Sequence, residues 1–110
     1  MGRRYEVVWA PLAEGDAETI VDFIAVDEPA NAERLLARLE AAARTLERFP
    51  NRGRVVPEMA EIGATHGREL VVSPYRIIYV VGDERVEVVA VVDGRRNART
   101  ILAERLRLRT

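Results

Sequence analysis

The stretch Arg68–Val81, which reads RELVVSPYRIIYVV, decides the fold of this 110-residue chain. Two runs within it, Arg68–Val72 and Arg76–Val81, are rich in β-branched and aromatic residues, which favour extended strands. Ser73-Pro74 separates the two runs, and proline suits a turn because its ring fixes one backbone angle and removes the N–H donor. This arrangement predicts two consecutive antiparallel strands.

The segments that follow extend the sheet and end in a helix. Val86–Val92 is a third apolar run, and the turn Gly82-Asp83-Glu84 before it predicts an antiparallel meander of three strands. Asn97–Leu108 has apolar residues at helical spacing, and it predicts a short helix capped by Asn97.

The segment that precedes the meander is irregular. Asn51-Arg52-Gly53 predicts a turn, and Val55-Val56-Pro57 predicts at most a short edge strand, because proline cannot donate to a ladder. Glu58–Gly67 predicts a loop, since two glycines interrupt it and no apolar period continues through it.

The first half of the chain predicts one strand and two amphipathic helices. Tyr5–Trp9 is β-branched and aromatic and predicts a strand. Apolar residues then recur every three or four positions, which predicts a helix that ends near Asp27. Glu28-Pro29 breaks this helix, and a stronger apolar stripe predicts a second helix that begins at Pro29 or Asn31 and ends at Phe49-Pro50.

The order of these elements predicts a single α+β domain over residues 1–110, with the topology β-α-α-β-β-β and a short C-terminal helix. The short connection makes the two long helices a hairpin, which should cover one face of a mostly antiparallel sheet. The strands are almost continuously apolar, so the second face also needs a cover. We expect a partner or a second copy to supply that cover.

Composition excludes several kinds of chemistry. All 17 residues of the Lys and Arg class are arginine, one histidine (His66) is present, and cysteine is absent. A thiol nucleophile, a lysine base and a cysteine metal site are therefore impossible, and one histidine cannot form a metal cluster. No apolar run approaches the ~20 residues that cross a bilayer. We expect a cytoplasmic protein with no metal, no cofactor and no membrane contact.

Charge is distributed unevenly along the chain. Residues 1–50 contain six arginines and ten acidic residues, whereas residues 94–110 contain six arginines and one acidic residue. The C-terminal segment is either a binding surface for phosphate or an acidic protein, or a solvated helix face.

Three arginines lie near strand ends. In a meander, the start of the strand with Arg76 and the segment with Arg96 meet at one end of the sheet, with Arg68 further away. Two guanidinium groups at one place could bracket a phosphodiester. The alternative is that they bind Glu69, Asp93 or carboxylates of a partner.

The chain resembles the RelE/ParE superfamily of type II toxin–antitoxin toxins over nearly its whole length. The resemblance rests on an ordered set of short motifs: Phe49-Pro50, Gly53-Arg54, Arg68-Glu69-Leu70, Tyr75–Tyr79 and Gly94-Arg95-Arg96. It implies a small bacterial toxin that is neutralised by an antitoxin. RelE-like members cut messenger RNA at the ribosome, and ParE-like members inhibit DNA gyrase.

The RelE pattern is only partly present. Its two arginines match Arg76 and Arg96, its strand lysines have Arg68 as their one counterpart, and its C-terminal catalytic Tyr falls on or near Leu102. No Tyr or His follows Tyr79. Without such a side chain, nothing obvious deprotonates a ribose 2′-OH. The long second helix and its FPNRGR exit resemble ParE more closely, although Asp93 stands where many relatives carry His.

The resemblance therefore implies a ParE-like gyrase inhibitor that works by binding, with a RelE-like mRNA interferase as the alternative and a co-repressor without toxicity as a third hypothesis. The expected partners are a ParD-like antitoxin in a hetero-oligomer, DNA gyrase, and operator DNA only through the antitoxin. The candidate site residues form three sets. The sets are Arg95, Arg96 and Arg99 for the target; Trp9, Tyr75 and Arg76 for the antitoxin; and Arg68, Arg76 and Arg96 for catalysis in a nuclease.

Overall fold

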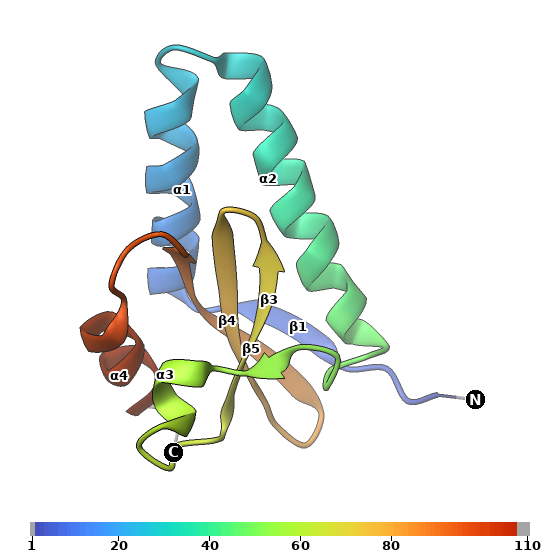
Figure 1. The fold of residues 1–110 in the computed structure, drawn as a ribbon. Coiled ribbons are helices and arrows are strands. Elements are labelled where there is room, and N and C mark those ends of the chain that lie inside the picture. Colours follow the sequence, from blue (N-terminus) through green and yellow to red (C-terminus); the bar gives the residue numbers. More distant parts are fainter. Residues whose placement is uncertain (1, 108–110) are drawn as a thin grey trace.

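A computed structural model describes residues 2–107, and it contains a five-stranded sheet with the strand order β1-β5-β4-β3-β2 (Figure 1). The strands are β1 (Glu6–Trp9), β2 (Arg54–Val55), β3 (Gly67–Val72), β4 (Tyr75–Val81) and β5 (Arg85–Asp93). β1 pairs with β5 in parallel, and the other neighbouring pairs are antiparallel. The mostly antiparallel α+β sheet predicted from the sequence is confirmed.

Helices lie on both sides of this sheet. They are α1 (Pro11–Ala25), α2 (Pro29–Arg44), α3 (Pro57–Ala60) and α4 (Arg99–Arg107), with a short 3-10 turn, Thr45–Glu47, after α2. Proline begins α1, α2 and α3, where its missing N–H has no intrahelical acceptor in any case. Within residues 2–107, no helix is both long enough and apolar enough to cross a bilayer.

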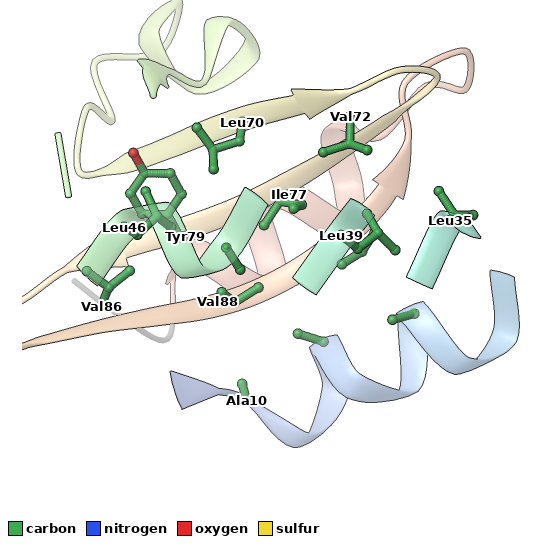
Figure 2. Close-up of a cluster of buried hydrophobic side chains, with 14 residues drawn as sticks. Ala10, Leu35, Leu39, Leu46, Leu70, Val72, Ile77, Tyr79, Val86 and Val88 are labelled. Carbon is green, nitrogen blue, oxygen red and sulfur yellow. The ribbon is translucent and has the colours of Figure 1, made fainter. Parts of the chain in front are cut away.

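The helical hairpin α1–α2 packs on one face of the sheet, as predicted (Figure 1). Leu39 and Leu46 meet Ile77 and Tyr79 in a core that excludes water (Figure 2). Tyr79 keeps its hydroxyl satisfied there, because the Gly53 N–H donates to it at 2.9 Å. Burial also raises the pKa of the Tyr79 phenol.

The second face of the sheet is covered by the chain itself. Ile78 and Val92 pack there against Met59 of α3 and Leu102 and Leu106 of α4. The expectation that only a partner or a second copy would cover this face is therefore wrong. The segment predicted as a loop contains one helical turn, α3, and this turn together with α4 supplies the apolar side chains.

The C-terminal helix forms with the predicted cap. The Asn97 side-chain oxygen accepts a hydrogen bond from the Arg99 N–H at 3.1 Å, which satisfies a donor at the helix start. Helix α4 ends at Arg107, and the predicted last residue, Leu108, lies outside the described residues.

One ion pair closes the edge of β5 beyond the end of β1. β1 pairs only with residues 85–88, so the rest of this edge needs other hydrogen-bond partners. The Val91 N–H donates to Asp16 of α1 at 3.0 Å, and Arg105 of α4 donates to the Val89 carbonyl at 2.8 Å. Arg105 also binds the Asp16 carboxylate at 2.8 and 3.1 Å. This clamp joins α1, β5 and α4.

We predict that Asp16→Asn destabilises the protein. The neutral amide cannot form an ion pair with the largely buried Arg105, and its single oxygen cannot accept all the hydrogen bonds that Val91 and Arg105 donate to Asp16. The free energy of unfolding in urea should fall by about 1–3 kcal/mol. Glu18→Gln is the matched control on the same helix and should change it by less than about 0.5 kcal/mol. Equal effects of the two variants would contradict the clamp.

Candidate functional site

A groove of about 540 Å³ lies between α1, the end of β5 and the loop that leads to α4. We call it the arginine groove, because Arg95 and Arg96 lie at its rim. Ile20, Tyr75 and Ile101 contribute apolar surface to its walls. The groove therefore combines apolar surface with the guanidinium groups of Arg95 and Arg96 and the carboxylates of Asp16 and Asp93, which suits a partner with exposed apolar and polar groups.

Arg95 and Arg96 differ in how firmly Asp93 holds their side chains. Arg95 is held by Asp93, with hydrogen bonds of 2.9 and 2.8 Å from its guanidinium and a third of 2.9 Å from its N–H. These bonds from Arg95 lower the pKa of the Asp93 carboxyl to about 2, and the pKa of Arg95 rises. Arg96 lies 4.0 Å from the same carboxylate, and 84% of its side chain is exposed. Arg96 is thus the more available cation.

Phe23 is a residue of this groove that the sequence reasoning missed. It lines the groove from α1, although 81% of its surface is exposed. A large aromatic side chain in water is costly, and aromatic residues are frequent anchors of protein interfaces. A phenylalanine at the border of the apolar stripe of an amphipathic helix was the available signal.

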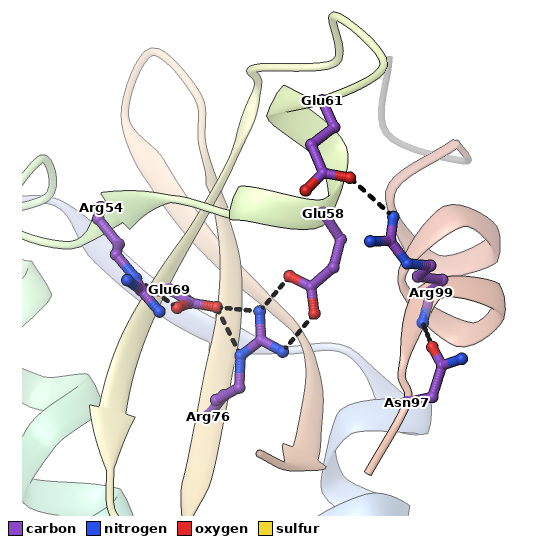
Figure 3. Close-up of polar contacts among 7 residues, drawn as sticks. All are labelled: Arg54, Glu58, Glu61, Glu69, Arg76, Asn97 and Arg99. Carbon is purple, nitrogen blue, oxygen red and sulfur yellow. Dashed lines mark hydrogen bonds and ion pairs between the residues drawn. The ribbon is translucent and has the colours of Figure 1, made fainter. Parts of the chain in front are cut away.

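Arg76 does not line the groove, and two carboxylates bind its guanidinium on the side of the sheet that α3 covers (Figure 3). Its Nε donates to Glu69 at 2.7 Å, and its two terminal nitrogens donate to Glu58 at 2.8 and 2.7 Å. Glu69 is fully buried and also binds Arg54 at 2.6 Å. We call these four residues the Arg76 cluster.

Hydrogen bonds within the Arg76 cluster shift the pKa values of Glu58 and Arg76. The hydrogen bonds from Arg76 lower the pKa of the Glu58 carboxyl from 4.5 to about 2. The same bonds raise the pKa of the Arg76 guanidinium. Arg76 is therefore charged and fully engaged by protein carboxylates, so of the two alternatives posed by the sequence, the structure shows Arg76 in an internal ion pair.

The three arginines proposed for a nuclease are not brought together. Gly94 lies against the aliphatic part of Arg76, so the two segments do meet at one end of the sheet as expected. The charged end of Arg76 nevertheless points to Glu58 and Glu69, whereas Arg96 is exposed in the loop. Arg68 donates to the Gly53 carbonyl at 2.7 Å. Because side chains alternate along a strand, Arg68 projects from the face opposite to Glu69.

The remaining candidates lie at different places. Arg99 of α4 binds Glu61 at 3.0 Å and does not line the arginine groove. Trp9 lines a separate groove between α1 and α2. Of the residues expected to contact the antitoxin, only Tyr75 shares the arginine groove with the residues expected to contact the target.

Comparisons with known proteins place the chain in the RelE/ParE superfamily of type II toxins, and solved structures of that superfamily share its fold. The family of the ParE toxin of the type II toxin-antitoxin system, parDE, matches residues 7–98. The chain belongs to this family.

The similar proteins include some named after RelE and some named after ParE. "Toxin RelE2" of Caulobacter vibrioides is 37% identical over 86 residues, which span 78% of this chain and 91% of that protein. The chromosomal ParDE system of P. aeruginosa has the same fold, with a TM-score of 0.68 and 17% identity over 82% of this chain and 96% of that chain. The toxin-antitoxin complex RelBE2 of Mycobacterium tuberculosis has a TM-score of 0.58 and 21% identity over 83% of this chain and 92% of that chain.

We predict that Glu58→Gln lowers the free energy of unfolding at neutral pH by about 1–3 kcal/mol, because Arg76 is then left with one carboxylate fewer in a largely buried site. Glu61→Gln is the matched control. It removes an exposed ion pair and should change the free energy by less than about 1 kcal/mol.

The wild-type protein should also show a defined pH dependence. Because the pKa of Glu58 is lowered from 4.5 to about 2 on folding, its ion pair stabilises fully above about pH 4.5 and is lost as the pH falls toward 2. Unfolding measured in urea between pH 6 and 3 should therefore show a smaller loss of stability in Glu58→Gln than in the wild type. Identical slopes would contradict a lowered pKa for Glu58.

Proposed function

We propose that this protein is a ParE-like toxin that arrests growth by binding DNA gyrase and that performs no covalent chemistry. The observation that carries the proposal is the Arg76 cluster. Arg76 matches a catalytic residue of RelE-like toxins, and here Glu58 and Glu69 bind it. These carboxylates neutralise the charge of the guanidinium and occupy its hydrogen-bond donors, so Arg76 is poorly placed to bind a phosphate.

The C-terminal helix supports the same conclusion. RNA cleavage by an internal 2′-OH needs a group that accepts the proton and a group that stabilises the charge on phosphate. The C-terminal Tyr of RelE-like toxins falls on or near Leu102, which is fully buried against the sheet, and no Tyr or His follows Tyr79 in this chain.

The arginine groove is the proposed contact with the target. Arg96 offers an exposed charge, Arg95 a second charge held in place by Asp93, and Phe23 an apolar anchor. Arg99 of the predicted target set lies outside the groove and is not part of this proposal.

An antitoxin is the second proposed partner. Two of the solved structures with this fold are a ParDE system and a RelBE2 toxin-antitoxin complex, which supports an antitoxin as partner. We propose that this chain forms a hetero-oligomer with a ParD-like antitoxin in the bacterial cytoplasm, and that it reaches operator DNA only through that antitoxin.

The second candidate function is a ribosome-dependent mRNA interferase. The name of the relative Toxin RelE2 favours it, at 37% identity over 86 residues. This alternative requires Arg76 to leave Glu58 and bind a phosphate.

The test is a supercoiling assay with purified gyrase beside a primer-extension search for cuts in translated messages. We expect inhibition at near-stoichiometric toxin and no codon-specific cuts. The double variant Phe23→Ala, Arg96→Ala should need about tenfold more protein or greater for the same inhibition, because an anchor and its neighbouring charge are lost together.

The matched control is Ile62→Ala, Arg85→Ala, which removes another exposed large apolar residue and an exposed arginine outside the groove. This control should inhibit like the wild type. Cuts in messages together with unaffected gyrase would reject the proposal in favour of the interferase.

A further inference from the structure

A third groove, of about 550 Å³, lies at the C-terminal end of α2, where the chain turns from the helical hairpin toward β2. Phe49 lines it, and 63% of the Phe49 surface is exposed. Three arginines also line it, namely Arg44, Arg48 and Arg52. We call this site the Phe49 groove. It shares no residue with the arginine groove or with the Arg76 cluster.

The Phe49 groove has an uncompensated positive charge. Its single acidic residue, Glu47, is bound by Arg4 at 3.5 Å. Within residues 2–107, Arg44, Arg48 and Arg52 form no ion pair. The partial negative charge at the end of α2 favours a cation at Arg44, but this effect is confined to the last turn of a helix. It does not explain Arg52, which lies beyond the 3-10 turn.

The Phe49 side chain faces solvent although its neighbours in the chain are buried. Leu46, three residues before it, and Pro50, directly after it, are both buried. Exposure of an apolar ring to water is unfavourable. An exposed aromatic ring among cationic side chains is the kind of surface on which unpaired nucleic-acid bases stack.

The turn after the 3-10 helix holds Arg52 in position. Its guanidinium donates to the Thr45 hydroxyl at 2.7 Å, and this hydroxyl donates to a carbonyl oxygen of α2 at 2.6 Å. Gly53 follows Arg52 and packs so closely on β3 that an added Cβ would overlap a backbone carbonyl of that strand. Arg52 is therefore held from both sides, which lowers the cost of ordering this side chain when a ligand binds.

We infer that the Phe49 groove binds single-stranded DNA, with phosphates on the three guanidinium groups and an unpaired base stacked on Phe49. A guanidinium binds phosphate through two parallel hydrogen bonds. A positively charged groove with an aromatic platform binds single strands without sequence preference, because every base has a π-face. A base inside a duplex is stacked between its neighbours, so this groove does not serve operator DNA.

The other polar side chains of the groove do not favour RNA. The Thr45 hydroxyl and the Glu47 carboxylate already have partners in the protein. Among the residues that line the groove, no uncommitted side-chain acceptor remains that could select ribose through its 2′-OH. We therefore expect RNA of the same sequence to bind no more tightly than DNA.

Fluorescence anisotropy with the full chain and a labelled oligothymidylate tests the chemistry. The oligonucleotide should bind at low salt. The logarithm of its affinity should fall against the logarithm of the salt concentration with a slope of about −2, as for three phosphates neutralised on a single strand.

The comparison ligands are a duplex of the same sequence, the matching oligouridylate and a glutamate-rich peptide. The duplex and the peptide should bind at least about fivefold more weakly, because neither offers a base to stack. Absence of oligothymidylate binding, equal affinity for the duplex or the peptide, or tighter binding of the RNA would overturn the inference.

Two double variants locate the binding. Arg44→Gln, Arg48→Gln leaves one of the three arginines, so the slope should shrink to about −0.7 and the affinity at low salt should fall by about tenfold or more. Arg34→Gln, Arg38→Gln removes the same charge from exposed positions of α2 outside the groove and should change both quantities much less. Thermal unfolding should show both variants folded. Equal effects of the two variants would mean a non-specific charge effect and would overturn the site.

A variant of the aromatic residue tests the stacked base. Phe49→Ala should weaken oligothymidylate binding by about fivefold or more and leave duplex binding unchanged. Equal losses for the single strand and the duplex would overturn the stacking on Phe49.

The gyrase variant separates this inference from the proposed function. Phe23→Ala, Arg96→Ala changes only the arginine groove and should bind oligothymidylate like the wild type. Failure of the gyrase assay would reject the proposed target and leave the oligonucleotide result intact. Loss of oligothymidylate binding in this variant would place the DNA in the arginine groove and overturn the inference.

Discussion

The ion pair between Arg76 and its two carboxylates is the interaction on which the second half of the structure depends. Glu69 lies on β3, Arg76 on β4 and Glu58 on α3, so one guanidinium joins two neighbouring strands to the helical turn above them. Removing charges from water is costly unless each is paired and hydrogen bonded, and this cluster meets that condition. The same bonds hold α3 over the sheet and take Arg76 out of reach of a ligand.

Two ion-pair clusters attach the helices to the sheet. The Arg76 cluster fastens α3, while Asp16 and Arg105 fasten α4 and α1 to the free edge of β5. Both faces of the sheet are therefore covered by helices of the chain itself. Two grooves lie beside α1, and they differ in charge: arginines and carboxylates line one of them, whereas the charged residues that line the other are all acidic.

Most of the fold could be predicted from the sequence, because alternation and helical spacing are local signals. The meander around Ser73-Pro74 and the hairpin around Pro29 both formed where the pattern placed them. The pattern failed for Glu58, because a single helical turn is too short to show a period. The partner of Arg76 was also hidden, since 18 residues separate it from Glu58 and no local signal reports such a pairing.

The absence of lysine has a consequence that only the structure makes visible. Arg76 binds one carboxylate through Nε and a second through its two terminal nitrogens, and Arg105 binds Asp16 and a backbone carbonyl together. A guanidinium can do this because its donors are fixed in a plane, whereas an ammonium is a point charge. Arginines are therefore used here as structural connectors between elements. Carboxylates neutralise the charge of such a connecting arginine, so the number of arginines in the sequence overstates the positive charge on the protein surface. Exposed Arg96 contributes to that surface charge, whereas buried Arg76 does not.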